Sequence, residues 1–126
     1  MTRMLAYRPM NRLVPAACLA AFAGCAAALA AGGEAKTFKV ELQPGAVHEE
    51  CQRVEAGDKR GYSWKSDTAV DFNIHYHRDP EVFYPVKRSA MRGDGGSFAA
   101  KTGEDYCWMW SARDKPARLE GRVESR

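Results

Sequence analysis

The sequence contains few of the residue arrangements on which enzyme chemistry is built. Its 126 residues include three histidines and four cysteines, and no two cysteines form a Cys-x-x-Cys pair. This absence excludes a thioredoxin-like redox centre, which uses two closely spaced thiols. No serine lies in a nucleophile elbow, and the glycine cluster at residues 93–96 lacks the preceding strand and following helix of a phosphate-binding loop. We therefore expect a protein without catalytic activity and without a cofactor.

Helix signals are also almost absent beyond the N-terminal region. Instead, short segments alternate apolar and polar residues, and turn residues such as Pro44-Gly45 separate them. Alternation with a period of two is typical of strands that bury one face. About eight such strands at regular spacing predict an all-β fold, namely a small antiparallel β-sandwich. The expected strands cover residues 38–42, 46–55, 59–65, 69–77, 82–86, 97–100, 105–112 and 117–124, with a loop at 87–96.

Residues 1–31 have the pattern of a secretory signal peptide. Three arginines and no acidic residue precede Glu34, and residues 13–31 form an almost unbroken apolar run. A retained membrane anchor is the alternative, but Pro15 and the high alanine content fit a transmembrane helix poorly. Ala28-Leu29-Ala30 fits an ordinary cleavage site, whereas Phe22-Ala23-Gly24-Cys25 resembles a bacterial lipobox that would lipidate Cys25.

These features predict a periplasmic or secreted protein, or one anchored to the envelope by a lipid on Cys25. The alanine- and arginine-rich composition is typical of a bacterium. Cleavage after residue 30 would remove three basic residues and no acid, so the formal net charge would fall from +3 to 0. A neutral domain gives no electrostatic reason to expect nucleic-acid binding. About 95 residues remain, enough for one domain, which we assign to residues 36–126.

Cysteine use agrees with an oxidising compartment. Cys18 and Cys25 lie in the expected signal peptide, which leaves Cys51 and Cys107 in the mature chain. Two cysteines allow one intramolecular pairing, so a Cys51–Cys107 disulfide is expected.

The segment at residues 69–77 carries the clearest strand pattern in the chain. One face is apolar and should lie at the centre of the core, while the other face should be exposed. The core face holds Val70, Phe72, Ile74 and Tyr76, and the exposed face holds Ala69, Asp71, Asn73, His75 and His77.

Two histidines on the expected exposed face form the main candidate for a metal site. His75 and His77 are two residues apart on one strand, so their side chains should lie close enough to share an ion. His48 is a candidate third ligand if its strand lies alongside, and Asp71 or Asp79 is a candidate carboxylate ligand. The alternative interpretation is an exposed strand face with no special role.

The strand at residues 105–112 is the most aromatic in the sequence. Tyr106, Trp108 and Trp110 share one face, and Trp64 and Phe72 are ready partners for them in a core. Three large rings are many for so small a domain. Trp110, near the strand end, is therefore the candidate for a ligand or partner contact.

A spaced series of cysteine, glycine and aromatic residues runs through the mature chain. It consists of Cys51, Gly57, Tyr62, Trp64, the strand at 69–77, a glycine-rich loop, Gly103, Tyr106, Cys107 and a closing strand. This series resembles the GOLD (Golgi dynamics) domain over roughly residues 38–123. That domain occurs in the lumenal part of eukaryotic cargo adaptors and in Sec14-like lipid-transfer proteins.

The resemblance implies a compact β-sandwich that binds proteins or cargo without catalysis. It also implies a disulfide between the segments that correspond to Cys51 and Cys107. In the family the second cysteine commonly lies three residues after the tyrosine, whereas Cys107 follows Tyr106 directly. Both spacings are odd, so the cysteine should lie on the face opposite the tyrosine. Only the fold and a general binding role carry over, because the coiled coil, membrane span and cytoplasmic tail of the adaptors are not expected here.

We therefore predict a non-enzymatic secreted or periplasmic binding module that is a monomer or a weak oligomer. Its partner is an unidentified protein or small ligand, and contact with a membrane is expected only through a lipid on Cys25. The alternative function is periplasmic handling of copper or zinc through His75 and His77.

Overall fold

The computed structural model describes residues 34–125, and these residues form an antiparallel β fold. The expected signal peptide and lipobox lie outside the described residues. Within the described part of the chain, no helix is long and apolar enough to span a membrane. The strands are β1 (Ala35–Leu42), β2 (Val47–Val54), β3 (Lys59–Arg78), β4 (Glu81–Ala99), β5 (Glu104–Ala112) and β6 (Ala117–Glu124).

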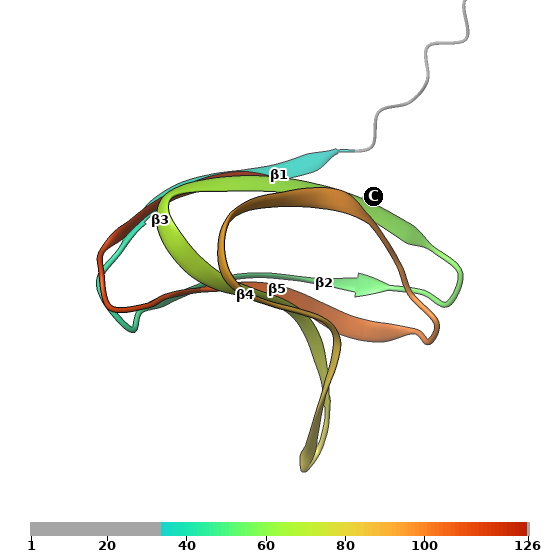
Figure 1. The fold of residues 1–126 in the computed structure, drawn as a ribbon. Helices are drawn as coiled ribbons and strands as arrows, with labels where there is room; N and C mark the ends of the chain where they lie inside the picture. The colour runs from blue at the N-terminus through green and yellow to red at the C-terminus, as the bar shows by residue number, and fades with distance from the viewer. Residues whose placement is uncertain (1–33, 126) are drawn as a thin grey trace, which may run out of the picture. The chain divides into compact units, whose positions relative to one another are not determined.

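Two long strands, β3 and β4, run through both layers of a sandwich. The first part of β3 pairs with β6 over residues 62–66, and its second part pairs with β5 over residues 70–75. β1 extends the first layer beside β6, and β2 extends the second layer beside β5. Figure 1 shows β3 and β4 curving together from one layer to the other. The all-β sandwich prediction is confirmed.

The number of strands differs from the prediction for a physical reason. The sequence divides β3 at Ser66-Asp67, where a turn is expected, but the chain only bends there. β4 follows β3 on both sides of the bend, with a register shift between Lys65 and Val70. Because the hairpin stays paired through the bend, six long strands replace the expected eight short ones.

The expected loop at residues 87–96 is wrong, since this segment belongs to β4. Its glycines permit close pairing: a Cβ added at Gly93 would lie 3.1 Å from the Trp64 carbonyl oxygen. A bulge lies at Ala90, whose φ is +54°. There the Ala90 N–H donates a hydrogen bond of 2.9 Å to the Asp71 carboxylate. Glycine marks a bent strand here, and not a loop.

The apolar faces of both layers meet in one core. Val70, Phe72 and Ile74 are each 0% exposed, as the alternation at residues 69–77 predicts. Gly121 lies between Phe38 and Trp64 in the first layer. A Cβ at Gly121 would lie 2.6 Å from the Phe38 ring, so the missing side chain lets neighbouring rings fill this part of the core.

The aromatic face of β5 is entirely buried. Tyr106 is 1% exposed, and Trp108 and Trp110 are both 0% exposed. The prediction that Trp110 contacts a ligand or partner is therefore wrong. β5 is hydrogen-bonded to β3 on one side and to β2 on the other. β5 is therefore not an edge strand, and its inner face lies against the first layer.

The expected disulfide is present. Cys51 and Cys107 lie directly opposite each other in the β2–β5 ladder, with their Cα atoms 4.0 Å apart. Tyr106 is buried in the core, whereas Cys51 lies exposed on the outer face of the second layer. The bridge therefore ties β2 to β5 on the face opposite the tyrosine, as predicted.

Candidate functional site

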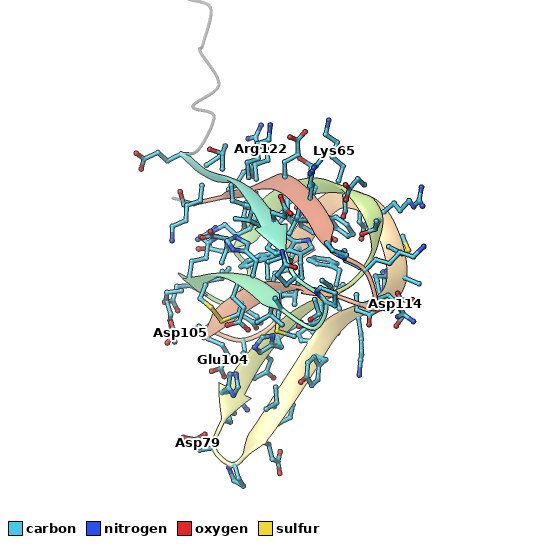
Figure 2. The ribbon with its side chains drawn as sticks, turned by 90° about the vertical axis from the view of Figure 1, so that its left-hand side faces the viewer. Lys65, Asp79, Glu104, Asp105, Asp114 and Arg122 are labelled. Carbon is cyan, nitrogen blue, oxygen red and sulfur yellow. A yellow bond between two sulfur atoms is a disulfide. The ribbon has the colours of Figure 1, made fainter. Side chains whose placement is uncertain are left out.

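The far end of the β3–β4 hairpin extends beyond the sandwich. Pairing between β3 and β5 ends at His75, so the residues beyond it pair only with β4. We call residues 76–86 the arm. Figure 2 shows the arm projecting from the body, with Asp79 at its tip. An exposed projection of this kind is available for contact with another molecule.

A groove of about 610 Å³ lies where the arm meets the body. We call it the arm groove. The Tyr76 and Phe83 rings stack at 5.0 Å between centroids, and the Tyr106 ring packs edge-on against Tyr76 at 5.1 Å. The volume of the arm groove is within the range of small-ligand sites, and its lining is mostly apolar. The lining residues are Tyr76, Phe83, Tyr84, Pro85, Val86, Phe98, Ala99, Lys101, Thr102 and Tyr106.

Arg78 fixes the arm to the body. Its guanidinium lies 5.5 Å from the Tyr76 ring centroid and 5.8 Å from that of Phe83. Its Nε donates a hydrogen bond of 2.7 Å to Glu104 at the start of β5. A cation beside the aromatic rings and an ion pair to β5 therefore connect the arm with the body.

His75 and His77 lie on the opposite side of the arm base, and they differ in exposure. His77 is exposed, but His75 is 5% exposed, contrary to its expected exposure. The Tyr84 ring lies 5.7 Å from the His75 ring. His75 Nδ1 is 2.8 Å from the Asn73 side-chain oxygen, and Nε2 is 3.7 Å from a Glu49 oxygen. Side chains of neighbouring strands therefore cover His75.

Burial should make stability depend on His75 protonation. Desolvation lowers the pKa of His75 from 6.5; the Glu49 carboxylate opposes this effect and His77 adds to it. Below pH 6.5 the unfolded chain therefore binds a proton that the folded chain resists, so stability should fall with acidification toward the depressed pKa. In chemical denaturation at several pH values, His75→Gln should reduce the pH slope in this window. An unchanged slope in that variant, with His77→Gln as control, would contradict this assignment.

His48 lies away from the other two histidines. It is half-buried on the inner face of β2, beside the rings of Phe38 and Trp110. His75 is in register with Cys107 on the outer face of the same layer. The structure therefore does not provide His48 as a third ligand. The Asp71 carboxylate accepts hydrogen bonds from Ala90 and Arg113, which hold its pKa below the usual value.

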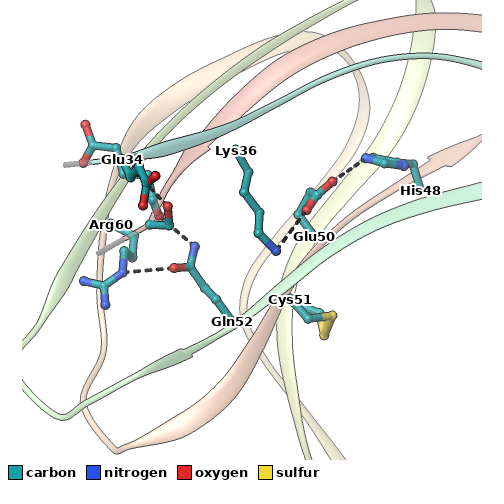
Figure 3. Close-up of polar contacts among 10 residues, drawn as sticks. Glu34, Lys36, His48, Glu50, Cys51, Gln52 and Arg60 are labelled. Carbon is teal, nitrogen blue, oxygen red and sulfur yellow. Dashed lines mark hydrogen bonds and ion pairs between the residues drawn. A yellow bond between two sulfur atoms is a disulfide. The ribbon is translucent and has the colours of Figure 1, made fainter. Parts of the chain in front are cut away.

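A polar cluster joins the edge strands β1 and β2, as Figure 3 shows. His48 lies 3.2 Å from Glu50, and Lys36 lies 3.8 Å from the same carboxylate. Gln52 donates to the Glu124 carbonyl oxygen at 2.7 Å and accepts from Arg60 at 3.2 Å. These contacts cross from one layer to the other, so His48 belongs to an inter-layer contact.

The histidine pair can be tested directly as a metal site. Among residues 34–125 no group of three His, Cys, Asp or Glu side chains is placed to hold an ion. Because zinc normally takes three or four protein ligands, we expect affinities on the order of 1 mM for zinc or copper. The measurement is a titration of untagged protein. Micromolar binding that disappears in His77→Ala would establish the metal site instead.

Sequence reasoning missed the arm groove. Phe83, Tyr84 and Phe98 were not singled out, because each lies in a short segment without a recognisable motif. The available signal was the apolar run at residues 82–86, which continues past a proline and ends next to Lys87. Only the long hairpin brings this run against Tyr106.

Comparisons with known proteins identify the fold but no family. No family model and no curated protein sequence matches the chain. The pre-peptidase C-terminal domain of collagenase from Bacillus anthracis is 17% identical, with a TM-score of 0.55, over 71% of this chain and 88% of that chain. The Yersinia pseudotuberculosis-derived mitogen is 8% identical, with a TM-score of 0.53, over 75% and 87% respectively. At these identities the likeness extends to the fold alone.

Proposed function

We propose that this protein is a non-enzymatic, extracytoplasmic binding module and that the arm groove is its contact surface. The observation that carries the proposal is the aromatic groove between the projecting arm and the body. Aromatic side chains supply large contact areas and fix orientation at binding sites. The Arg78–Glu104 ion pair favours the proposal further, because a surface held in place loses less entropy on binding.

The chemistry of the lining favours binding over catalysis. The lining contains tyrosine, phenylalanine, proline, valine, alanine, lysine and threonine. It has no histidine, cysteine, serine or carboxylate, which are the commonest nucleophiles and general bases. The disulfide supports an extracytoplasmic location, since such bridges persist in oxidising compartments. The resemblance to GOLD domains agrees with the same role and remains part of the proposal.

Replacing Phe83 should remove most of the binding. Phe83→Ala takes away the ring that stacks on Tyr76, so we expect at least a tenfold loss of affinity for the partner. The measurement is affinity capture of the mature protein from its own cell envelope, with the recovered partner quantified by mass spectrometry. Val47→Ala is the control, because Val47 is 54% exposed on β2 and does not line the groove.

Circular dichroism should show that both variants remain folded. Equal recovery of the same partner by Phe83→Ala and by the unaltered protein would rule out the arm groove as the contact surface.

A further inference from the structure

The disulfide and a histidine lie side by side on the outer face of the second layer, away from the arm groove. Cys107 on β5 is in register with Cys51 on β2 on one side and with His75 on β3 on the other. Opposite residues of antiparallel strands project from the same face, with Cβ atoms about 4.5–5.5 Å apart. The two sulfur atoms and the imidazole therefore form one row across three neighbouring strands.

The imidazole of His75 is directed across β5 toward β2. Its Nε2 atom lies 3.7 Å from an oxygen of Glu49, which precedes Cys51 by two positions and shares its face of β2. Its Nδ1 atom lies 2.8 Å from the Asn73 side-chain oxygen. Because an amide oxygen can only accept, Nδ1 carries the proton and Nε2 has a free lone pair. Nε2 is thus able to bind a metal ion.

We propose that reduction of the disulfide creates a zinc site on this face, independently of any ligand of the arm groove. Its four ligands are the thiolates of Cys51 and Cys107, Nε2 of His75 and the Glu49 carboxylate. Zinc takes four ligands of these types in a tetrahedral arrangement. The Nδ1 contact with Asn73 is the supporting hydrogen bond that zinc-bound histidines usually make.

The bridge and the zinc ion exclude each other. While the bridge is closed, neither sulfur is a thiolate, and residues 34–125 contain no group of three side chains placed to hold an ion. A dithiol reductant supplies two electrons and two protons: the S–S bond breaks, two cysteine thiols form, and the dithiol closes into a cyclic disulfide. Zinc then displaces one proton from each thiol as it binds. Cys51 is exposed, so the reductant has access.

The mixed donor set favours zinc over other ions and over the histidine pair. Copper(I) selects soft sulfur ligands, whereas calcium and magnesium take oxygen ligands. Nε2 of His75 is directed toward Glu49 on β2, but His77 lies two positions further along β3, past the end of its pairing with β5. His77 is therefore not a ligand of this site, and it provides a matched control.

The test is a zinc titration of untagged protein, with and without a phosphine reductant, in competition with a coloured chelator. A phosphine replaces the dithiol because dithiols themselves bind zinc. The reduced protein should bind zinc at least about a thousandfold more tightly than the oxidised protein. In the reduced protein, His75→Gln and Glu49→Gln should each weaken zinc binding at least about tenfold, whereas His77→Gln should leave it unchanged. The reductant should not alter zinc binding by Cys51→Ala/Cys107→Ala.

Thermal melting gives a second measurement that depends on the folded site. Zinc should raise the melting temperature of the reduced protein by at least about 5 °C, because the ion binds the folded chain more tightly than the unfolded chain. The oxidised protein should melt at the same temperature with and without zinc. Cobalt(II) in place of zinc should give a near-ultraviolet thiolate charge-transfer band, which the double cysteine variant should lack.

Three results would overturn the proposal. Equal zinc affinity of the oxidised and reduced proteins would show that reduction creates no site. Loss of binding in His77→Gln, with Glu49→Gln unchanged, would place the ion at the histidine pair. Tight binding that is the same in all three variants, with loss of the near-ultraviolet circular dichroism of the aromatic core, would show that zinc binds an unfolded chain.

Discussion

Replacing Trp110 with alanine should lower the free energy of unfolding by about 3–5 kcal/mol, the range for truncation of a large buried aromatic residue. Trp110 is 0% exposed. Its ring contacts the rings of Phe38 at 4.6 Å and Phe72 at 5.4 Å, which come from different layers. The cavity left by truncation would lie between the layers, where rigid aromatic neighbours can collapse only partly.

Two comparisons make this prediction specific. Trp110→Phe should cost much less, because the indole N–H has no hydrogen-bond partner among residues 34–125 and a smaller ring still fills most of the space. Val47→Ala, at a 54% exposed position, should change stability by less than about 0.5 kcal/mol. The measurement is urea denaturation followed by far-UV circular dichroism. A loss below about 1 kcal/mol for Trp110→Ala would show that Trp110 does not occupy the core.

Removing the disulfide should have an effect of similar size. Cys51 and Cys107 are 56 residues apart, and closing such a loop stabilises by about 4 kcal/mol on the chain-entropy model. Native bridges typically contribute about 2–4 kcal/mol, and a domain of this length has a total stability of about 5–15 kcal/mol. The double variant Cys51→Ala/Cys107→Ala should therefore melt about 10 °C or more below the unaltered protein.

Reduction provides the matched experiment for the disulfide. Cys51 is exposed, so dithiothreitol should reach the bridge and lower the melting temperature of the unaltered protein toward that of the double variant. The double variant itself should not respond to the reductant. Peptide mass mapping that finds free thiols at both Cys51 and Cys107 would contradict the bridge.

The sequence predicted the local features of the fold well. Alternation in β3 and β5 correctly assigned Phe72, Trp108 and their neighbours to one buried face each. The pairing of Cys51 with Cys107 followed from the count of cysteines outside the predicted signal peptide. These features depend on strand geometry and on chemistry within short segments, which the sequence contains directly.

The errors concern what covers each face. His75 lies on the outer face of its layer, yet Tyr84 and Glu49 come from other strands and shield it. Trp110 is near a strand end, yet Phe38 from the other layer closes over it. Both outcomes depend on residues that are distant in sequence. Alternation within a single strand therefore cannot determine them.

The arm groove shows most clearly which features depend on local sequence and which depend on tertiary structure. The sequence by itself determined which residues of each strand share a face, because the period of two is a property of the extended backbone. Only the tertiary structure decided that β3 and β4 stay paired through a bend and continue past the end of β5. Because of that continuation, Phe83 lies beyond the body and stacks against Tyr76. The groove therefore depends on how far β3 and β4 remain paired and on where β5 ends.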